Sequence, residues 1–191
     1  IQSIQYSLLA GVDIIYHAEY SDEKTLDMLE EARDRIFVAP AISLFHTMLH
    51  DAEPFGLPRS VVEGMGIPAL IDESVKSHTE LRKRGIRHLI GGDYGFTWNM
   101  NGTNARDIKH FVDYYGYSPT AALVCATRNG GLAMRDQGDL GTLQEGMLAD
   151  MLLVDGDPLK DLTILTDKNC LALIMKDGAI HSQSPSLRHI T

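Results

Sequence analysis

The stretch VDIIYH, residues 12–17, indicates the class of fold. It is β-branched and apolar, and polar side chains do not alternate along it, which is typical of a strand covered on both faces in a parallel sheet. Two further short apolar runs, residues 36–40 and 87–92, have the same character. Because helical segments separate the three runs, the sequence predicts an α/β fold with right-handed βαβ units and a parallel sheet.

The expected helices are recognised by capping residues at their starts, an apolar stripe along them, and glycine where several of them end. They are predicted at residues 1–10, 21–35, 68–85, 103–116 and 118–129. Two starts are ambiguous, because Ser21 or Asp22 could cap the second helix and Thr103 or Asn104 the fourth. Ser118, followed by proline, caps the fifth.

Residues 41–66 separate the second and third apolar runs without an expected continuous element. Breakers recur in this segment at Pro54, Gly56, Pro58, Gly64 and Gly66. A connection of this length is usually functional, so we expect a lid that covers a site. His46 and His50 within it have the i, i+4 spacing of a helical metal pair but lack the glutamate of HExxH, so we interpret them as lid or surface residues.

Beyond about residue 135 the pattern changes to short strands and turns. Apolar runs lie within residues 141–159 and 171–181, and Asp177-Gly178 is a strong signal for a hairpin turn. We therefore expect two units, residues 1–135 with the parallel sheet and residues 136–191 with a small β-rich appendage and a tail.

Composition excludes several classes of function. The chain has 191 residues, 17 Lys and Arg against 26 Asp and Glu, and a formal net charge of −9. Nucleic-acid binding relies on clustered basic residues, so we expect no nucleic-acid partner. No apolar run approaches the roughly 20 residues of a membrane helix, and we expect a soluble, cytoplasmic protein. Cys125 and Cys170 lie far apart and outside any CxxC motif, which argues against a disulfide framework.

Two polar residues follow predicted strands, where α/β proteins place ligands and catalytic groups. His17 follows the first strand and Asp93 the third. An imidazole and a carboxylate that face one cavity suit a cation such as zinc. Taken singly, a histidine after a strand is more often packed or hydrogen-bonded than a metal ligand, and an aspartate at a strand end often caps the next helix. The glycines before Asp93 either let the chain run close to neighbouring strands or simply pack.

Aromatic residues follow Asp93 closely. Tyr94, Phe96 and Trp98 could line a pocket for an apolar or aromatic part of a substrate, or could pack the loop itself.

Six blocks of sequence resemble, in order, the C-terminal half of the metal-dependent amidohydrolase superfamily. They are AGVDIIYHAEYSDEKTLDML (10–29), HLIGGDYG (88–95), NGTNARDIKHFV (101–112), YSPTAALVCATRNGGLAM (117–134), GDLGTLQEGMLADMLLVDGDPLKDLTIL (138–165) and LIMKDGAIH (173–181). The imidazolonepropionase-like and Xaa-Pro-dipeptidase-like branch is the most similar. The resemblance implies the C-terminal part of a (β/α)₈ TIM-type barrel, strands six to eight with their helices, and part of a small β-sandwich that both chain termini build.

The same resemblance assigns roles to individual residues. His17 corresponds to a metal ligand after strand six, and Asp93 to a ligand after strand eight that is also the proton shuttle. It implies Zn²⁺ or another divalent metal and hydrolysis of an amide, peptide-like or cyclic-amide C–N bond in a small-molecule or dipeptide-like substrate. Asn101 stands where relatives often carry a histidine in an HG.N stretch, so we count it among the substrate-binding candidates.

The resemblance also implies that the family's remaining ligands follow earlier strands, upstream of the position of Ile1. Two ligands do not complete a zinc site, which normally holds three or four protein groups. An N-terminal half of the barrel is therefore an expected partner, and open sheet edges favour association, including a homo-oligomer. The competing interpretation is a catalytically silent half-barrel with a structural or assembly role.

Overall fold

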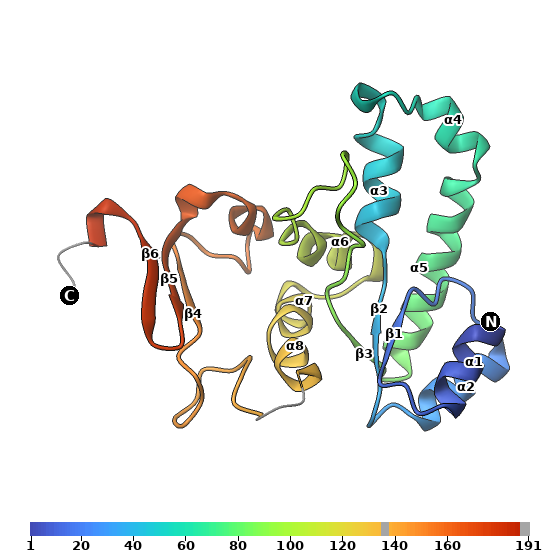
Figure 1. Cartoon of the computed structure of the whole chain (residues 1–191), viewed down its shortest axis with the longest axis horizontal. Coiled ribbons are helices and arrows are strands. Elements are labelled where there is room, and N and C mark those ends of the chain that lie inside the picture. The colour runs from blue at the N-terminus through green and yellow to red at the C-terminus, as the bar shows by residue number, and fades with distance from the viewer. Residues whose placement is uncertain (135–137, 188–191) are drawn as a thin grey trace.

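The computed structural model describes residues 1–134 and 138–187 (Figure 1). Its first sheet contains β1 (Ile14–Tyr16), β2 (Phe37–Ala39) and β3 (Arg87–His88), in that order and all parallel. The α/β class and the parallel sheet predicted from the three apolar runs are confirmed. The third strand is shorter than predicted, although Leu89 still donates a backbone hydrogen bond to Val38.

Helices connect the strands and pack against them. Their bounds are α1 Gln2–Leu9, α2 Glu23–Glu31, α3 Ile42–His50, α4 Arg59–Gly64, α5 Ile67–Lys83, α6 Arg106–Tyr115, α7 Pro119–Ala126 and α8 Arg128–Ala133. Asp22 caps α2 by accepting a hydrogen bond from the Thr25 amide, and Ser118 caps α7. The predicted cap of α6 is wrong, because the helix begins at Arg106 after Ala105 and the Asn104 side chain instead accepts from the Gly102 amide.

The prediction that residues 41–66 contain no continuous element is also wrong. Helix α3 begins directly after β2 and buries Ile42, Leu44 and Phe45, and α4 follows a short 3₁₀ turn at Glu53–Phe55. The breakers lie after α3, so they interrupt only the second half of the segment. The first half is part of the core, because its apolar side chains pack against α5 and α6.

Side chains are buried on both faces of the parallel sheet. Val38 packs with α2 and α5 on one face, whereas Phe37, Ala39 and Leu89 form a second cluster with Ala133 of α8 on the other. This arrangement explains why the strands read as continuous apolar runs rather than as alternating ones.

The second sheet is antiparallel and lies beyond α6, α7 and α8 from the first sheet (Figure 1). It contains β4 (Met151–Val154), β5 (Leu171–Lys176) and β6 (Ala179–Gln183). Three 3₁₀ turns flank these strands, at Leu162–Thr166, Lys168–Cys170 and Pro185–Leu187. The predicted Asp177-Gly178 hairpin turn joins β5 to β6, with Lys176 paired to Ala179. The predicted boundary at residues 135 and 136 lies outside the described residues.

Within residues 1–134 and 138–187, no helix is both long enough and apolar enough to cross a membrane.

Candidate functional site

The chain just before Asp93 runs against the ends of the other two parallel strands, and His17 follows directly after β1. The His17 amide donates to the Ala39 carbonyl at the end of β2, at 2.9 Å. A Cβ at Gly91 would lie 2.9 Å from the Ala39 Cβ and 3.9 Å from the Tyr16 ring, so only glycine fits there. Of the two interpretations of these glycines, close approach of the chain to neighbouring strands therefore applies to Gly91. The structure brings His17 and Asp93 to the same edge of the sheet.

His17 and Asp93 both adopt the left-handed backbone conformation, which is unusual for residues with a side chain. Their φ angles are 72° and 52°. Such conformations cost of order 1–3 kcal/mol, persist only where the surroundings enforce them, and cluster at functional sites. Both residues are exposed at this edge. The strain at both strand ends makes this edge the candidate site.

The His17 imidazole is held from one side by Glu19. His17 Nδ1 lies 3.3 Å from Glu19 Oε1, and the Glu19 side chain is 8% exposed against 47% for that of His17. This hydrogen bond is the main cause that raises the pKa of His17. Burial lowers that pKa, and the nearby charges of Glu19 and Asp93 raise it further.

A buried amide fixes the backbone that carries Asp93. Asn99 is fully buried, and its Nδ2 donates to the carbonyls of Gly92 and Asp93 at 2.8 and 3.0 Å. Its Oδ1 accepts from the Ser43 hydroxyl of α3 at 3.2 Å. The loop that follows β3 is therefore pinned to the helix that follows β2, and the Asp93 carboxylate has no hydrogen-bond partner among the described residues.

Tyr94 is turned toward the protein interior. Its hydroxyl donates to the buried carboxylate of Asp107 at 2.5 Å, and His110 Nδ1 lies 3.3 Å from the other oxygen of that carboxylate. Burial, followed by the charge of Asp107, raises the pKa of Tyr94. A Cβ at Gly92 would collide with Asp107, Ser43 and Tyr94 at 2.4 to 2.6 Å. Tyr94 thus braces the loop through its hydroxyl.

The other predicted substrate-binding residues lie further along this loop. The rings of Phe96 and Trp98 stack at a centroid distance of 5.7 Å and an interplanar angle of 20°. Phe96 is 42% exposed, and the indole nitrogen of Trp98 is buried without a partner among the described residues. Asn101 is exposed in a turn. Phe96 and Asn101 are therefore exposed on this loop, whereas Trp98 is partly buried.

His46 and His50 lie on α3 with ring centroids 4.6 Å apart. His46 Nδ1 is 2.7 Å from the Tyr114 hydroxyl, and burial together with nearby His110 lowers the pKa of His46 to about 4. His50 is exposed, as expected for a surface residue. In the described part of the chain, no three His, Cys, Asp or Glu side chains converge on a point that could hold a metal ion.

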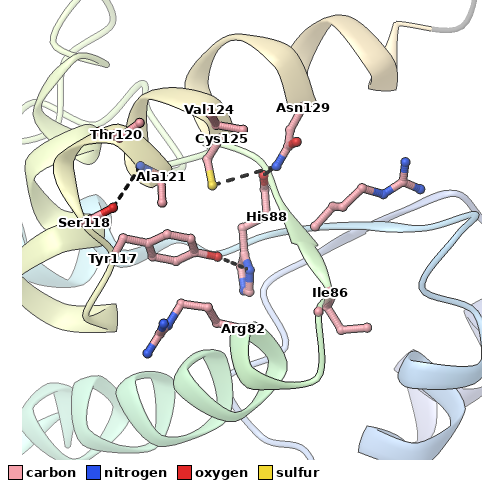
Figure 2. Close-up of a pocket in the computed structure, with 12 residues that line it drawn as sticks. Arg82, Ile86, His88, Tyr117, Ser118, Thr120, Ala121, Val124, Cys125 and Asn129 are labelled. Carbon is pink, nitrogen blue, oxygen red and sulfur yellow. Dashed lines mark hydrogen bonds between the residues drawn. The ribbon is translucent and has the colours of Figure 1, made fainter.

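A pocket of about 460 Å³ lies beside β3 and α7 (Figure 2). His88 reaches it from β3. The Tyr117 hydroxyl lies 2.8 Å from His88 Nδ1, and His78 of α5 lies 3.0 Å from His88 Nε2. Burial lowers the pKa of His88 to about 4, and it also lowers the pKa of His78 well below its usual value. The pocket is lined partly by Gly85 and Ile86, which precede β3, and by none of the predicted site residues, so we assign it no chemistry.

Sequence reasoning missed Glu19, Asn99 and Asp107, the three buried polar groups that support the site. Glu19 follows His17 by two residues, but the sequence does not indicate their contact, since it depends on how the chain turns after β1. Asn99 and Asp107 carry no signal that distinguishes them from the neighbouring Asn101 and Asp113.

The donor set at this edge fits a divalent cation in kind. His17 Nδ1 is engaged by Glu19, whereas its Nε2 has no hydrogen-bond partner in the described ranges, and Asp93 is an exposed carboxylate. A neutral imidazole nitrogen and a carboxylate oxygen are ordinary zinc ligands. The set is incomplete in number, since a zinc site takes at least one more protein ligand.

The molecule is thus an α/β protein with a strained, polar cluster at one edge of a parallel sheet. Residues 9–180 match the Amidohydrolase family. The chain belongs to this family, as its six blocks of sequence indicate.

Known proteins resemble it over nearly its whole length. Ochratoxinase from Aspergillus niger is 25% identical over 178 residues, which cover 93% of this chain and 35% of that protein. The crystal structure of A. niger ochratoxinase superposes with a TM-score of 0.81 at 22% identity, covering 96% of this chain and 40% of that one. A putative prolidase from Bifidobacterium longum gives a TM-score of 0.80 at 25% identity, covering 94% and 44%. The chain therefore spans about a third of the length of its curated relatives.

Proposed function

We propose that this chain provides the C-terminal part of a metal-dependent hydrolase that cleaves an amide, peptide-like or cyclic-amide C–N bond. The observation that carries the proposal is the placement of His17 and Asp93, both in strained conformations, at one edge of the parallel sheet of a family member. In α/β proteins with parallel sheets, ligands and catalytic groups gather at the carboxyl ends of the strands.

In this proposal, β1, β2 and β3 are strands six to eight of a (β/α)₈ barrel. Their sequential order and parallel register are those of consecutive barrel strands. An N-terminal half would close the barrel, supply the missing ligands and cover the antiparallel sheet, which would be the C-terminal part of a small β-sandwich. Residues 1–135 and 136–191 are the corresponding units. The open edges of a half-barrel also favour association, so a homo-oligomer is part of the proposal.

His17 and Asp93 would hold Zn²⁺ or another divalent cation. When bound, such an ion lowers the pKa of water toward neutrality and polarises a carbonyl group. The Asp93 carboxylate, which is exposed, would accept the proton of the attacking water and donate it to the leaving nitrogen. Asn99 keeps the Asp93 backbone in place during both proton transfers, because its side-chain amide donates to the backbone carbonyls of Gly92 and Asp93.

The substrate class we propose is a small molecule or a dipeptide-like compound. Its support is the similarity to a putative prolidase and to ochratoxinase. The exposed ring of Phe96, which stacks on the partly buried Trp98, would contact an apolar or aromatic substituent, and Asn101 offers an amide in the following turn. Tyr94 would contact the substrate only through its aromatic ring, because its hydroxyl donates a hydrogen bond to Asp107.

The test replaces Asp93 by Asn in the complete enzyme. Loss of a general acid and base lowers turnover of dipeptide substrates by at least about 10²-fold, while the folded structure remains. Asp177→Asn is the matched control, because Asp177 has a similar φ of 49° in the distant hairpin turn. Unchanged turnover in Asp93→Asn would refute the role of Asp93.

The silent half-barrel is the second candidate, favoured by the absence of a three-ligand cluster in the described residues. Metal analysis combined with native mass measurement separates the two. Stoichiometric zinc together with a second polypeptide supports the enzyme, and a metal-free species of 21.1 kDa supports the silent form.

A further inference from the structure

We infer that Glu19 is a positioning residue that fixes the His17 imidazole, with Nδ1–H directed at the Glu19 carboxylate and Nε2 directed outward as the metal-binding nitrogen. The inference deepens the proposed function, on which its metal-binding part rests. It begins from a local feature of the backbone. His17 and Ala18 are consecutive left-handed residues, with φ angles of 72° and 82°. A strand that leaves the sheet without constraint would not adopt two such conformations in succession.

Contacts from another helix hold this bend. The Ala18 carbonyl accepts a hydrogen bond from the Ser77 hydroxyl of α5 at 2.7 Å, and Ser21 donates to the same carbonyl at 3.4 Å. Ala18 and Ser77 are 3% and 5% exposed. The bend therefore belongs to the packed core between the strand end and α5, and it is not a fluctuation of an exposed loop.

Because of this bend, the side chain of Glu19 points back toward the imidazole of His17. Glu19 Oε1 lies 3.3 Å from His17 Nδ1 although the residues are only two apart in sequence. Burying a carboxylate is unfavourable unless a hydrogen-bond donor compensates it. In the described residues, the only hydrogen-bond partner of the Glu19 carboxylate is His17, so the energetic cost of its burial is compensated through the imidazole.

The chemical consequence follows from the two nitrogens of an imidazole. The hydrogen bond made by one nitrogen determines which nitrogen carries the proton and which is available to a metal. A histidine that ligates a metal nearly always donates its other N–H to a carboxylate, a carbonyl or water, and loss of such a partner costs 10- to 100-fold in metal affinity. Glu19 stands in that relation to His17, whose Nε2 lies on the opposite side of the ring.

The experiment compares Glu19→Gln and Glu19→Ala with the unaltered chain by ¹⁵N NMR of the His17 ring, at an alkaline pH above the titration of the imidazole observed in the same spectra. With Glu19 present, we expect the Nδ1–H tautomer. Glu19→Ala shifts the population toward the Nε2–H form, and Glu19→Gln, which retains a neutral acceptor, gives an intermediate value. Zn²⁺ titration followed through the same signals gives an affinity weaker by about 10- to 100-fold in Glu19→Ala.

Glu23→Gln is the matched control, since Glu23 is exposed on α2, pairs with Arg84 and makes no contact with His17. It leaves both readouts unchanged. Glu19→Gln is nearly isosteric, so it remains informative if Glu19→Ala fails to fold. An unaltered tautomer ratio in a folded Glu19 variant overturns the inference. Measuring the tautomer ratio requires neither metal nor turnover. If the unaltered chain does not bind Zn²⁺, that result counts against the proposed function, whereas the tautomer ratio still tests the role of Glu19.

Discussion

The parallel sheet lies between two layers of buried side chains, whereas no residue of β4, β5 or β6 is buried. Leu29, Ile36 and Val38 beside the first sheet are completely inaccessible, while Leu152 and Leu153 of β4 are 57% and 51% exposed. The antiparallel sheet is joined to the main core through Leu162, which packs with the cluster around α3 and α6. The two sheets are therefore stabilised by different interactions.

The two regions also differ in how their polar side chains are buried and held. Near the parallel sheet, polar groups are buried and held by partners distant in sequence, such as Ser43 with Asn99. Near the antiparallel sheet the ion pairs lie at the surface. Asp150 pairs with Lys176 and accepts from the Asp177 amide, which aligns the strand ends without burying either charged group. Precise placement of reactive groups requires the first kind of environment, where packing fixes each side chain.

Leucine-to-alanine substitutions test the contrast most directly and give the largest expected effect. Leu29→Ala removes a completely buried side chain and lowers the free energy of unfolding by about 2–5 kcal/mol. Leu152→Ala makes the same chemical change on an exposed strand and alters it by no more than about 0.5 kcal/mol. Urea denaturation of both variants measures the difference. Equal losses would show that β4 is buried in solution by an interface.

The sequence predicted elements whose signals are local. The strands were recognisable by their apolar runs, α7 by Ser118 and Pro119, and the hairpin by Asp177-Gly178. Helix α3 was missed because the prolines and glycines after residue 53 dominated the interpretation of the whole segment. Its core contacts with α5 and α6 are distant in sequence and leave no local mark.

The same distinction applies to the candidate site. His17 and Asp93 could be located because strand ends are identifiable in sequence. Glu19 could not, because its contact with His17 requires two successive left-handed residues, neither of which is glycine. Asn99 acts through backbone carbonyls that any residue possesses. Supporting groups of this kind become visible only when the backbone conformation is known.

Acid should weaken the parallel region through its buried histidines. Burial lowers the pKa of His88 to about 4, whereas an unfolded histidine titrates near 6.5. Between these values the unfolded state binds more protons, so stability falls as the pH decreases through this window. By pH 5, His88 alone accounts for about 2 kcal/mol, and His78 and His46 act in the same direction. The raised pKa of His17 acts in the opposite direction.

Urea denaturation at pH 7.5, 6 and 5 measures this effect above the range where most carboxylates titrate. Hydrogen exchange resolves it by region, with protection in α5 and β2 expected to fall more steeply than in the hairpin β5–β6. A free energy of unfolding that stays constant from pH 7.5 to 5 would contradict the neutral, buried state of the histidine pair.

Glycine-to-alanine substitutions give the smallest effect and test whether the antiparallel sheet depends on its turn. Gly178 has a φ of 74° and no atom within 4 Å of an added Cβ, so Gly178→Ala is opposed by conformation alone and costs about 1–2 kcal/mol. Gly130 of α8 also has free space but lies in a right-handed helix, where alanine stabilises by about 0.4–1 kcal/mol. Thermal unfolding should therefore shift in opposite directions. A Gly178→Ala variant as stable as the unaltered chain would mean that contacts other than the two-residue turn hold the antiparallel sheet. The antiparallel sheet would then resemble the parallel one in depending on contacts between residues distant in sequence.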